Sequence, residues 1–404
     1  MRDKITLNRV ISLPLLVFYG VGTILGAGIY ALSGKIAGLS GIYAPVSFLL
    51  SALIAAFVAF SYAELSSRFP KSGGEAVYVN QAFDRAWLTA LVGWGVVLTG
   101  IVSAAVMAHG FYGYLNEFTK ISVAVSIICY VVFITIVAIS GISISVKFAA
   151  LVTIIEITGV ALILYVSQDS LMTLPDRWHE FIPPFSWDIW QTIIFGAFIA
   201  FYAFIGFEDM VNVAEEVIEP EKNLPAGIII ALLITTVAYV LVSFAFVLTL
   251  PIDKLANHPA PFALIIKENS QVPVSIISLI SLIAILNGAL VQIVMGSRVM
   301  YGMAEQGVAP AYFKVINPKT RTPVMATVFF SILLLIFALW LPIVTLAKIT
   351  SFIILAIFAL INLSLCVIKL RHYQQGAQGY INVHIAIPGI GFILCLGFVL
   401  LQFK

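Results

Sequence analysis

Residues 20–28 read Gly-Val-Gly-Thr-Ile-Leu-Gly-Ala-Gly, and they lie inside the first long apolar segment of the chain. They do not form a dinucleotide-binding loop, because no strand precedes them and no soluble βαβ unit surrounds them. Two interpretations remain. Gly22 and Gly26 form a GxxxG pair, which lets membrane helices pack closely. Alternatively, Gly26-Ala27-Gly28 breaks the helix and frees backbone N–H groups at the start of a half-helix, where the helix dipole favours a carboxylate.

A second interrupted segment, residues 201–209, decides between these interpretations. It reads Phe-Tyr-Ala-Phe-Ile-Gly-Phe-Glu-Asp, with two acids directly after a glycine in an apolar run. Acidic residues in a membrane segment are functional candidates by default. If the helix simply ended near Ile205, a polar loop should follow, yet residues 210–214 continue the apolar pattern. We therefore favour a broken helix at Gly206 and, by analogy, at Gly26.

The composition of the chain is that of a membrane protein. Of 404 residues, 61% are hydrophobic and 10% charged, with a mean hydropathy of +1.09, whereas soluble domains are about half apolar. The net charge of +2 is small and the basic residues are dispersed, so no nucleic-acid partner is expected. The three cysteines fall in apolar runs and the spacing of the five histidines fits no metal site, so we expect no metal, no cofactor and no catalytic group.

Eleven segments are long and apolar enough to cross a bilayer. Only Leu341 and Pro342 separate the ninth from the tenth. In order, they are residues 11–32, 43–65, 87–107, 121–140, 146–166, 189–211, 226–250, 274–300, 324–340, 343–370 and 383–403.

The distribution of basic residues predicts the orientation. With a cytoplasmic N-terminus (residues 1–10), the inner loops and helix ends hold 14 of the 21 Lys and Arg residues. Positive charge is retained on the cytoplasmic side of a membrane. We therefore expect a multi-pass protein of the cell (plasma) membrane with its N-terminus inside.

The two interrupted segments are the first and the sixth, five helices apart. Because five is odd, the second set of five helices inserts in the opposite orientation, which is the pattern of an inverted repeat with a binding site at the broken helices. The division expected is 11–166 for the first repeat, 189–370 for the second, and 383–404 for an additional transmembrane helix. The long amphipathic loops 68–85 and 253–271 then lie on opposite sides.

Four ordered motifs resemble those of the amino acid-polyamine-organocation transporters, in particular the bacterial members similar to cationic amino acid transporters. The resemblance implies an all-α membrane protein with the leucine-transporter-like five-plus-five fold, and a permease for amino acids. Many members have twelve helices, and the shortfall here leaves the oligomeric state open. The motifs are Gly-Ala-Gly-Ile-Tyr (26–30), Phe-Pro-Lys-Ser-Gly-Gly-Glu (69–75), Phe-Ile-Gly-Phe-Glu (204–208) with Ala-Glu-Glu-Val (214–217) and Asn-Leu-Pro-Ala-Gly (223–227), and Ser-Arg-Val-Met-Tyr-Gly-Met-Ala-Glu-Gln-Gly (297–307).

The resemblance also implies which positions bind substrate. Tyr202 matches an aromatic gate, although packing at a helix interface is its ordinary alternative. Glu208 matches a carboxylate below that gate. The carboxylate of the substrate would meet backbone N–H groups around Gly26, Ala27 and Gly28, and its ammonium would meet the carbonyls of Ile24, Tyr202 and Ile205 beside Gly206.

Glu156 lies near the middle of the fifth segment and is a candidate for coupling transport to a proton or another cation. It shares a helix face with Thr153, Gly159 and Val160, a face suited to close packing. The sequence places no basic residue at mid-membrane depth to pair with it. Relatives often have a Lys here, so their mechanism does not transfer directly. The alternative is a permanently protonated carboxyl that bonds a nearby carbonyl.

The sequence favours a secondary transporter over three alternatives. An exchanger of polyamines or other organic amines is the nearest. A membrane enzyme would need a nucleophile–base pair or metal ligands, yet His179-Glu180 lacks the second His of a zincin motif. A channel would show a filter loop or rings of like charge. Which amino acid is carried, and whether by uptake or exchange, is left open by the sequence.

Overall fold

All regular elements of the described chain are helices, and one isolated bridge pairs Ile11 with Val217. The predicted N-terminal segment 1–10 and the predicted last span 383–404 lie partly outside the described residues. For residues 27 and 146–149 only the backbone is described. The computed structural model describes residues 9–71, 74–140, 146–305, 307–320, 322–371 and 381–401.

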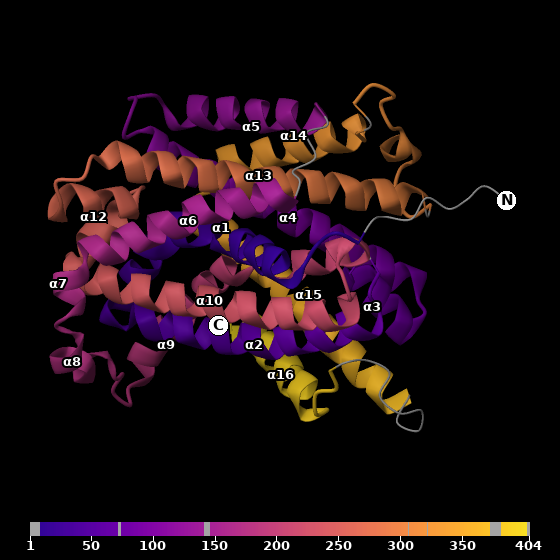
Figure 1. The fold of residues 1–404 in the computed structure, drawn as a ribbon, viewed down its shortest axis with the longest axis horizontal. Helices are drawn as coiled ribbons and strands as arrows, with labels where there is room; N and C mark the ends of the chain where they lie inside the picture. Colours follow the sequence, from indigo (N-terminus) through magenta and orange to yellow (C-terminus); the bar gives the residue numbers. More distant parts are fainter. Residues whose placement is uncertain are drawn as a thin grey trace.

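The long helices run side by side along the long axis of the molecule (Figure 1). Those of the first half of the chain are α1 (Leu13–Ser40), α2 (Ala44–Arg68), α3 (Gly74–Phe83), α4 (Ala86–Leu115), α5 (Val123–Ile139) and α6 (Val146–Val166). Short elements follow: α7 (Gln168–Leu171), α8 (Leu174–Arg177) and the 3₁₀ helix η2 (Trp178–Phe181), with η1 (Gly41–Tyr43) lying earlier. The second half holds α9 (Trp187–Ala200), η3 (Phe201–Phe204), η4 (Glu208–Glu216), α10 (Pro220–Thr249), α11 (Ile252–Asn257), α12 (Pro261–Asn269), α13 (Val274–Glu305), η5 (Ala311–Lys314), α14 (Val324–Trp340), α15 (Ile343–Arg371) and α16 (Ala386–Leu401).

Six helical stretches are long and apolar enough to cross a membrane, and five shorter apolar helices accompany them in the described residues. The gap between α14 and α15 falls at Leu341 and Pro342, as predicted. Apolar side chains such as Val132, Phe133 and Leu233 are exposed on the outer helices, as expected for surfaces in contact with lipid. The total of eleven spans and the inverted repeat stay predictions.

Both predicted interruptions are present. At Gly26 the backbone of α1 leaves the helical region, with φ −29° and ψ −142°. After η3, Ile205 is extended and Gly206 has a φ of +128°, which favours glycine because a Cβ is strained there. The predicted span 189–211 is therefore not one α-helix: α9 ends at Ala200, and the chain continues through η3, an extended link and η4.

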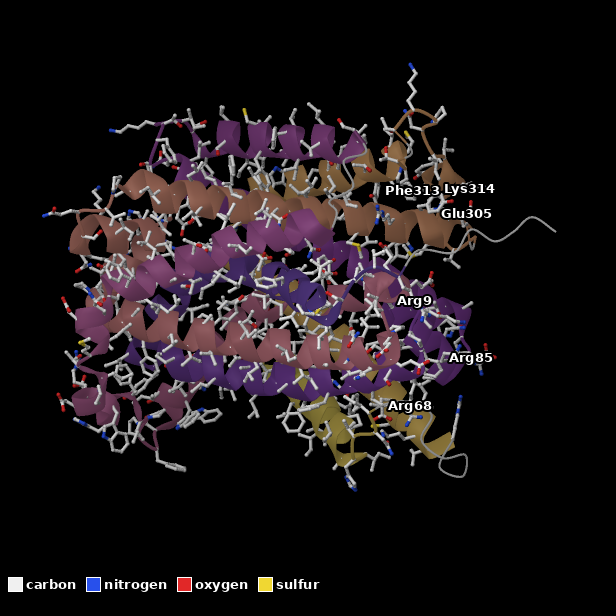
Figure 2. All side chains as sticks on the ribbon, in the orientation of Figure 1. Arg9, Arg68, Arg85, Glu305, Phe313 and Lys314 are labelled. Carbon is white, nitrogen blue, oxygen red and sulfur yellow. The ribbon has the colours of Figure 1, made fainter. Side chains whose placement is uncertain are left out.

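The two ends of the molecule carry the two predicted amphipathic loops. Helix α3 lies at the right-hand end in Figure 1, and α12 lies at the opposite end together with α7 and α8. Figure 2 shows Arg9, Arg68, Arg85 and Lys314, all predicted to be cytoplasmic, at the α3 end. Four of the basic side chains used for the orientation argument therefore lie at one end of the fold.

A buried carboxylate joins three segments at that end. Glu64 on α2 is fully buried and pairs with Arg68 one turn later and with Lys369 on α15, whose Nζ lies 2.7 Å away. The N–H of Val383 also donates to Glu64, at 2.8 Å. Because a buried charge is costly without partners, this cluster fixes the ends of α2 and α15 and the segment that leads into α16.

The chain just before α1 is bonded to the chain just after η4. The N–H groups of Val10 and Ile11 donate to the carbonyl of Glu216 at 2.9 and 3.0 Å, and the N–H of Ile218 donates back to Ile11 at 2.9 Å. Backbone hydrogen bonds thus connect the start of α1, before its break at Gly26, to the end of η4, after the break at Gly206.

Candidate binding site at two helix breaks

The two breaks touch each other through their glycines. A Cβ on Gly28 would collide with the backbone of Ala203 in η3, and one on Gly206 would lie 2.5 Å from the carbonyl oxygen of Thr23. At contacts this short a side chain would fit only if the neighbouring backbone shifted, so glycine is favoured at both positions. The sequence therefore brings distant segments into backbone contact by placing glycine in both; Thr23 and Gly206, for example, are 183 positions apart.

Two hydroxyl groups bridge the breaks. The Thr23 hydroxyl lies 3.0 Å from the carbonyl oxygen of Gly206 and 2.9 Å from that of Gly20. The Tyr239 hydroxyl on α10 lies 2.5 Å from the carbonyl oxygen of Ile24 and 2.7 Å from that of Ala203. The carbonyl of Ile24, a predicted acceptor for a ligand ammonium, thus has a protein donor within reach.

Gly26 is buried beside open space. A Cβ built on it would meet no described atom within 4 Å beyond its own stretch of chain. The predicted partner Ala27 is described by its backbone alone. A helix that restarts after a break leaves its first N–H groups without intrahelical acceptors, and the predicted ligand contacts at Gly26, Ala27 and Gly28 stay a prediction.

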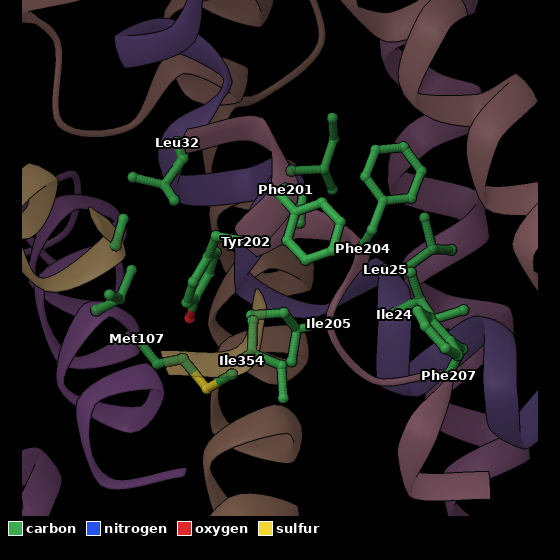
Figure 3. Packing of buried hydrophobic residues seen from close by; sticks show 14 of the residues in the cluster. Ile24, Leu25, Leu32, Met107, Phe201, Tyr202, Phe204, Ile205, Phe207 and Ile354 are labelled. Carbon is green, nitrogen blue, oxygen red and sulfur yellow. The ribbon is translucent and has the colours of Figure 1, made fainter. Parts of the chain in front are cut away.

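Tyr202 lies next to the second break, and its hydroxyl is hydrogen-bonded to Ser103. Its side chain is 3% exposed, and its hydroxyl lies 3.0 Å from both the Oγ and the carbonyl oxygen of Ser103 on α4. Its carbonyl accepts from the N–H of Ile205 at 3.3 Å. Figure 3 draws Tyr202 together with Ile205, Met107 and Ile354, all members of the buried apolar cluster.

Glu208 caps the second break. Its carboxylate accepts from the N–H of Gly206 at 2.7 Å, and its side chain is buried. A carboxylate at the start of a helical segment satisfies a free backbone donor. The predicted gate carboxylate therefore holds the shape of the break in this structure.

Glu156 lies on α6 against the first half of α1. It is fully buried, and a Cβ on Gly22 would lie 3.5 Å from its Oε2. The predicted face is confirmed at Thr153, whose hydroxyl donates to the carbonyl of Phe18 at 3.0 Å. The phenol of Tyr30, on the second half of α1, donates to the backbone carbonyl of Glu156 at 2.7 Å. Glu156 thus contacts α1 on the approach to its break.

The Glu156 carboxyl lacks a strong partner. The amide of Asn287 on α13 lies beside it, but within the described residues no hydrogen bond of good geometry reaches either Glu156 oxygen, or the Oδ1 of Asn287. Glu156 also belongs to none of the ion pairs found there. A buried carboxyl in this setting holds a proton or takes up a cation.

A cavity of about 780 Å³ opens at the α3 end. Elements α3, α4, η4 and α13 line it, with Lys71, Glu216 and Arg298 as the charged side chains. None of the predicted binding residues is among its lining residues. Asn212 and Glu216 connect the cavity to the second break through η4.

Sequence reasoning missed Ser103 and Tyr239, and it noted Thr23 only as part of the glycine stretch. Thr23 could have been singled out, because a hydroxyl in a break can satisfy a free carbonyl. Ser103 and Tyr239 are single polar groups in long apolar helices, and no spacing marks them.

Comparisons with known proteins give a consistent picture. A family model described as amino acid permease matches residues 11–403. The branched-chain amino acid permease BcaP of Bacillus subtilis (strain 168) is 28% identical over 409 residues, covering 95% of this chain and 86% of the relative. The methylthioribose transporter of the same organism is 28% identical over 414 residues (97% and 88%). The vacuolar cationic amino acid transporter 4 of Arabidopsis thaliana is 29% identical over 382 residues, and the match spans 88% of this chain but 62% of the relative. The family and these relatives are named as transporters, not as enzymes.

Proposed function

Because the chain belongs to the amino acid permease family, as its motifs predict, we propose that it carries amino acids across the membrane by alternating access, with the substrate bound at the two helix breaks. The observation that carries this proposal is the open space beside the buried Gly26, which lies where two interrupted helices meet. Broken helices present both backbone N–H and C=O groups at mid-membrane depth, and an amino acid zwitterion needs both.

The backbone of the breaks supplies the two polar contacts of the proposed site. The N–H groups that follow Gly26, at Ala27 and Gly28, would donate hydrogen bonds to the substrate carboxylate, and the helix dipole adds to their attraction for an anion. The carbonyls of Ile24, Tyr202 and Ile205 would receive the ammonium. These groups recognise the part that all α-amino acids share.

The side chains around the breaks favour an apolar substrate. Ile205, Met107 and Ile354 are buried beside Tyr202 (Figure 3), and an apolar lining leaves a charged substrate group without a partner. The name of the Bacillus subtilis branched-chain permease agrees with this choice. We therefore propose leucine, isoleucine and valine as the first substrates to test, ahead of the cationic amino acids.

Glu156 is proposed to couple this transport to a proton. Its carboxyl is buried against α1 and has no basic partner in the described residues. Gain and loss of a proton there would change the contact between α6 and the first half of α1, which is the half tied to the second break through Glu216.

The protein is further proposed to lie in the plasma membrane with the cavity and the α3 end facing the cytoplasm.

Reconstitution into liposomes tests the function directly. Purified protein is assayed with radiolabelled leucine, isoleucine, valine, arginine, putrescine and methylthioribose, with and without an inward proton gradient. We expect saturable uptake of leucine, isoleucine and valine that unlabelled leucine inhibits and the proton gradient increases. Uptake of putrescine alone would instead indicate an amine exchanger. Non-saturable flux would indicate a channel, and either result would contradict the proposal.

A further inference from the structure

The Tyr239 hydroxyl reaches a carbonyl group beside each break from a third helix, α10, whereas the other bridging hydroxyl, that of Thr23, belongs to α1 itself. The Tyr239 oxygen lies 2.5 Å from the carbonyl oxygen of Ile24 and 2.7 Å from that of Ala203. A phenol has a single proton. It can therefore satisfy only one of the two carbonyls at a time, although both are within hydrogen-bond distance.

The ring of Tyr239 is fixed, so this position of the hydroxyl is built into the fold. Tyr239 is fully buried on α10. Its ring packs against Phe204 of η3 at a centroid distance of 5.1 Å and against Phe48 of α2 at 5.8 Å. Aromatic contacts on two sides leave the hydroxyl little freedom to leave the breaks.

The carbonyl of Ile24 is also one of the proposed acceptors of the ammonium group of an amino acid. Because a carbonyl oxygen has two lone pairs, an ammonium placed beside the phenol could donate to the carbonyl of Ile24 without displacing the ring of Tyr239. A charge-assisted hydrogen bond is also stronger than a neutral one. The phenol is thus a weaker donor than the substrate ammonium, and it reaches a backbone carbonyl, that of Ile24, to which the ammonium is proposed to donate.

We propose that the Tyr239 hydroxyl stands in for the substrate ammonium and lets the two broken helices close on each other when the transporter is empty. This inference rests on the proposed function. Net uptake requires the empty carrier to close and reorient, whereas exchange needs only the loaded carrier to do so. Tyr239 would therefore support net uptake specifically.

The test compares Tyr239→Phe with wild type and with Tyr78→Phe. Tyr78 on α3 is a matched control, because it is equally buried and its hydroxyl has no hydrogen-bond partner in the described residues. Each protein is reconstituted without a pH gradient. Radiolabelled L-leucine is offered to liposomes that are either empty, for net uptake, or preloaded with unlabelled L-leucine, for exchange.

For Tyr239→Phe we expect net uptake to fall about fivefold to tenfold, the equivalent of one lost hydrogen bond, while exchange stays at the level of Tyr78→Phe. In detergent its Tm without leucine should be lower than that of the control, and added leucine should raise it more. A proportionate loss of both fluxes, or no loss, would overturn the inference while leaving the proposed function intact. Absence of leucine transport by the wild type would instead contradict the proposed function, and the inference with it.

Discussion

Gly28 on α1 lies against the backbone of Ala203 on η3 so closely that a Cβ on Gly28 would collide with the Cα of Ala203. Two residues earlier, Gly26 leaves the helical conformation and faces open space. Of the predicted GxxxG pair, Gly22 packs closely, since a Cβ on it would collide with the Thr153 hydroxyl, whereas a Cβ on Gly26 would meet no neighbouring helix within the described residues, and Gly26 forms the break. Whether Gly28 also contacts a ligand through its N–H stays a prediction.

Alanine substitutions separate these two roles. Gly26→Ala places a methyl group in the open space, so we expect the Kd for leucine to rise about tenfold, equivalent to roughly 1.4 kcal/mol, with an unchanged Tm. Gly28→Ala overpacks the contact with Ala203 and should cost about 1–3 kcal/mol of stability. Binding and thermal unfolding are measured on the same preparations.

Gly397→Ala is the matched control for Gly26→Ala, because its Cβ would also meet no described atom within 4 Å but it lies on α16, away from the breaks. Wild-type affinity in Gly26→Ala would show that the space beside Gly26 does not hold the substrate.

Tyr202 is expected to act through its ring more than through its hydroxyl. Tyr202→Phe removes the hydrogen bonds to Ser103, a loss of about 1 kcal/mol, but keeps the aromatic face. Tyr202→Ala removes both and should raise the Kd for leucine by at least tenfold, about 1.4 kcal/mol. Ser103→Ala provides the reference for loss of the side-chain contact alone. Equal losses in the Phe and Ala variants would assign the effect to the hydroxyl.

Local features of the sequence were sufficient to predict the apolar helices and both breaks. Hydrophobic length and glycine position are visible without tertiary information, which is why the interruptions at Gly26 and Gly206 and the boundary at Leu341 and Pro342 were found. Helix ends were less predictable. Helix α1 continues from Leu32 to Ser40 because Gly34 and Gly38 let it pack against α11, a contact made by residues more than 200 positions later.

The contacts that shape the site could not be predicted, because they join distant parts of the chain. The Tyr239 hydroxyl lies 215 positions from Ile24, and the Ser103 hydroxyl 99 positions from Tyr202. Nothing in an apolar helix marks which Ser or Tyr will face a break. Only the packing of α4 and α10 against α1 and η3 decides it.

Glu75 should make stability depend on pH. It is buried on α3 and accepts a hydrogen bond from the Tyr62 hydroxyl at 2.9 Å. Burial raises the pKa of Glu75 above its ordinary value of 4.5. The folded protein then binds this proton more tightly than the unfolded chain, so its contribution is fully present below pH 4.5 and is lost as pH rises through the raised pKa.

Glu75→Gln should therefore reduce the fall of Tm with rising pH above 4.5, measured by thermal unfolding in detergent. Glu221→Gln, at an exposed position in the first turn of α10, is the control and should keep the wild-type pH profile. An identical profile in Glu75→Gln would contradict the assignment.

Cysteine labelling tests the orientation. In a background without Cys129, Cys366 and Cys395, a cysteine at Ser170 should react with an impermeant maleimide added outside intact cells. A cysteine at Asn80, which lines the cavity at the α3 end, should react only after permeabilisation. The reverse pattern would place the N-terminus and the cavity outside.

Glu156→Gln tests the coupling proposal, because it keeps the shape of the side chain and most of its hydrogen-bonding capacity but cannot release a proton. A neutral Gln should remain compatible with the buried site against α1 and Asn287, so folding and leucine binding are expected to persist. Accumulation driven by a pH gradient should be abolished, while downhill entry and exchange continue.

This pattern differs from that of Tyr239→Phe, which should slow downhill net uptake as well. Glu75→Gln, another buried acid but on α3, should accumulate leucine normally. Unchanged accumulation in Glu156→Gln would make Glu156 a structural residue, a protonated carboxyl retained for its packing between α6 and the first half of α1.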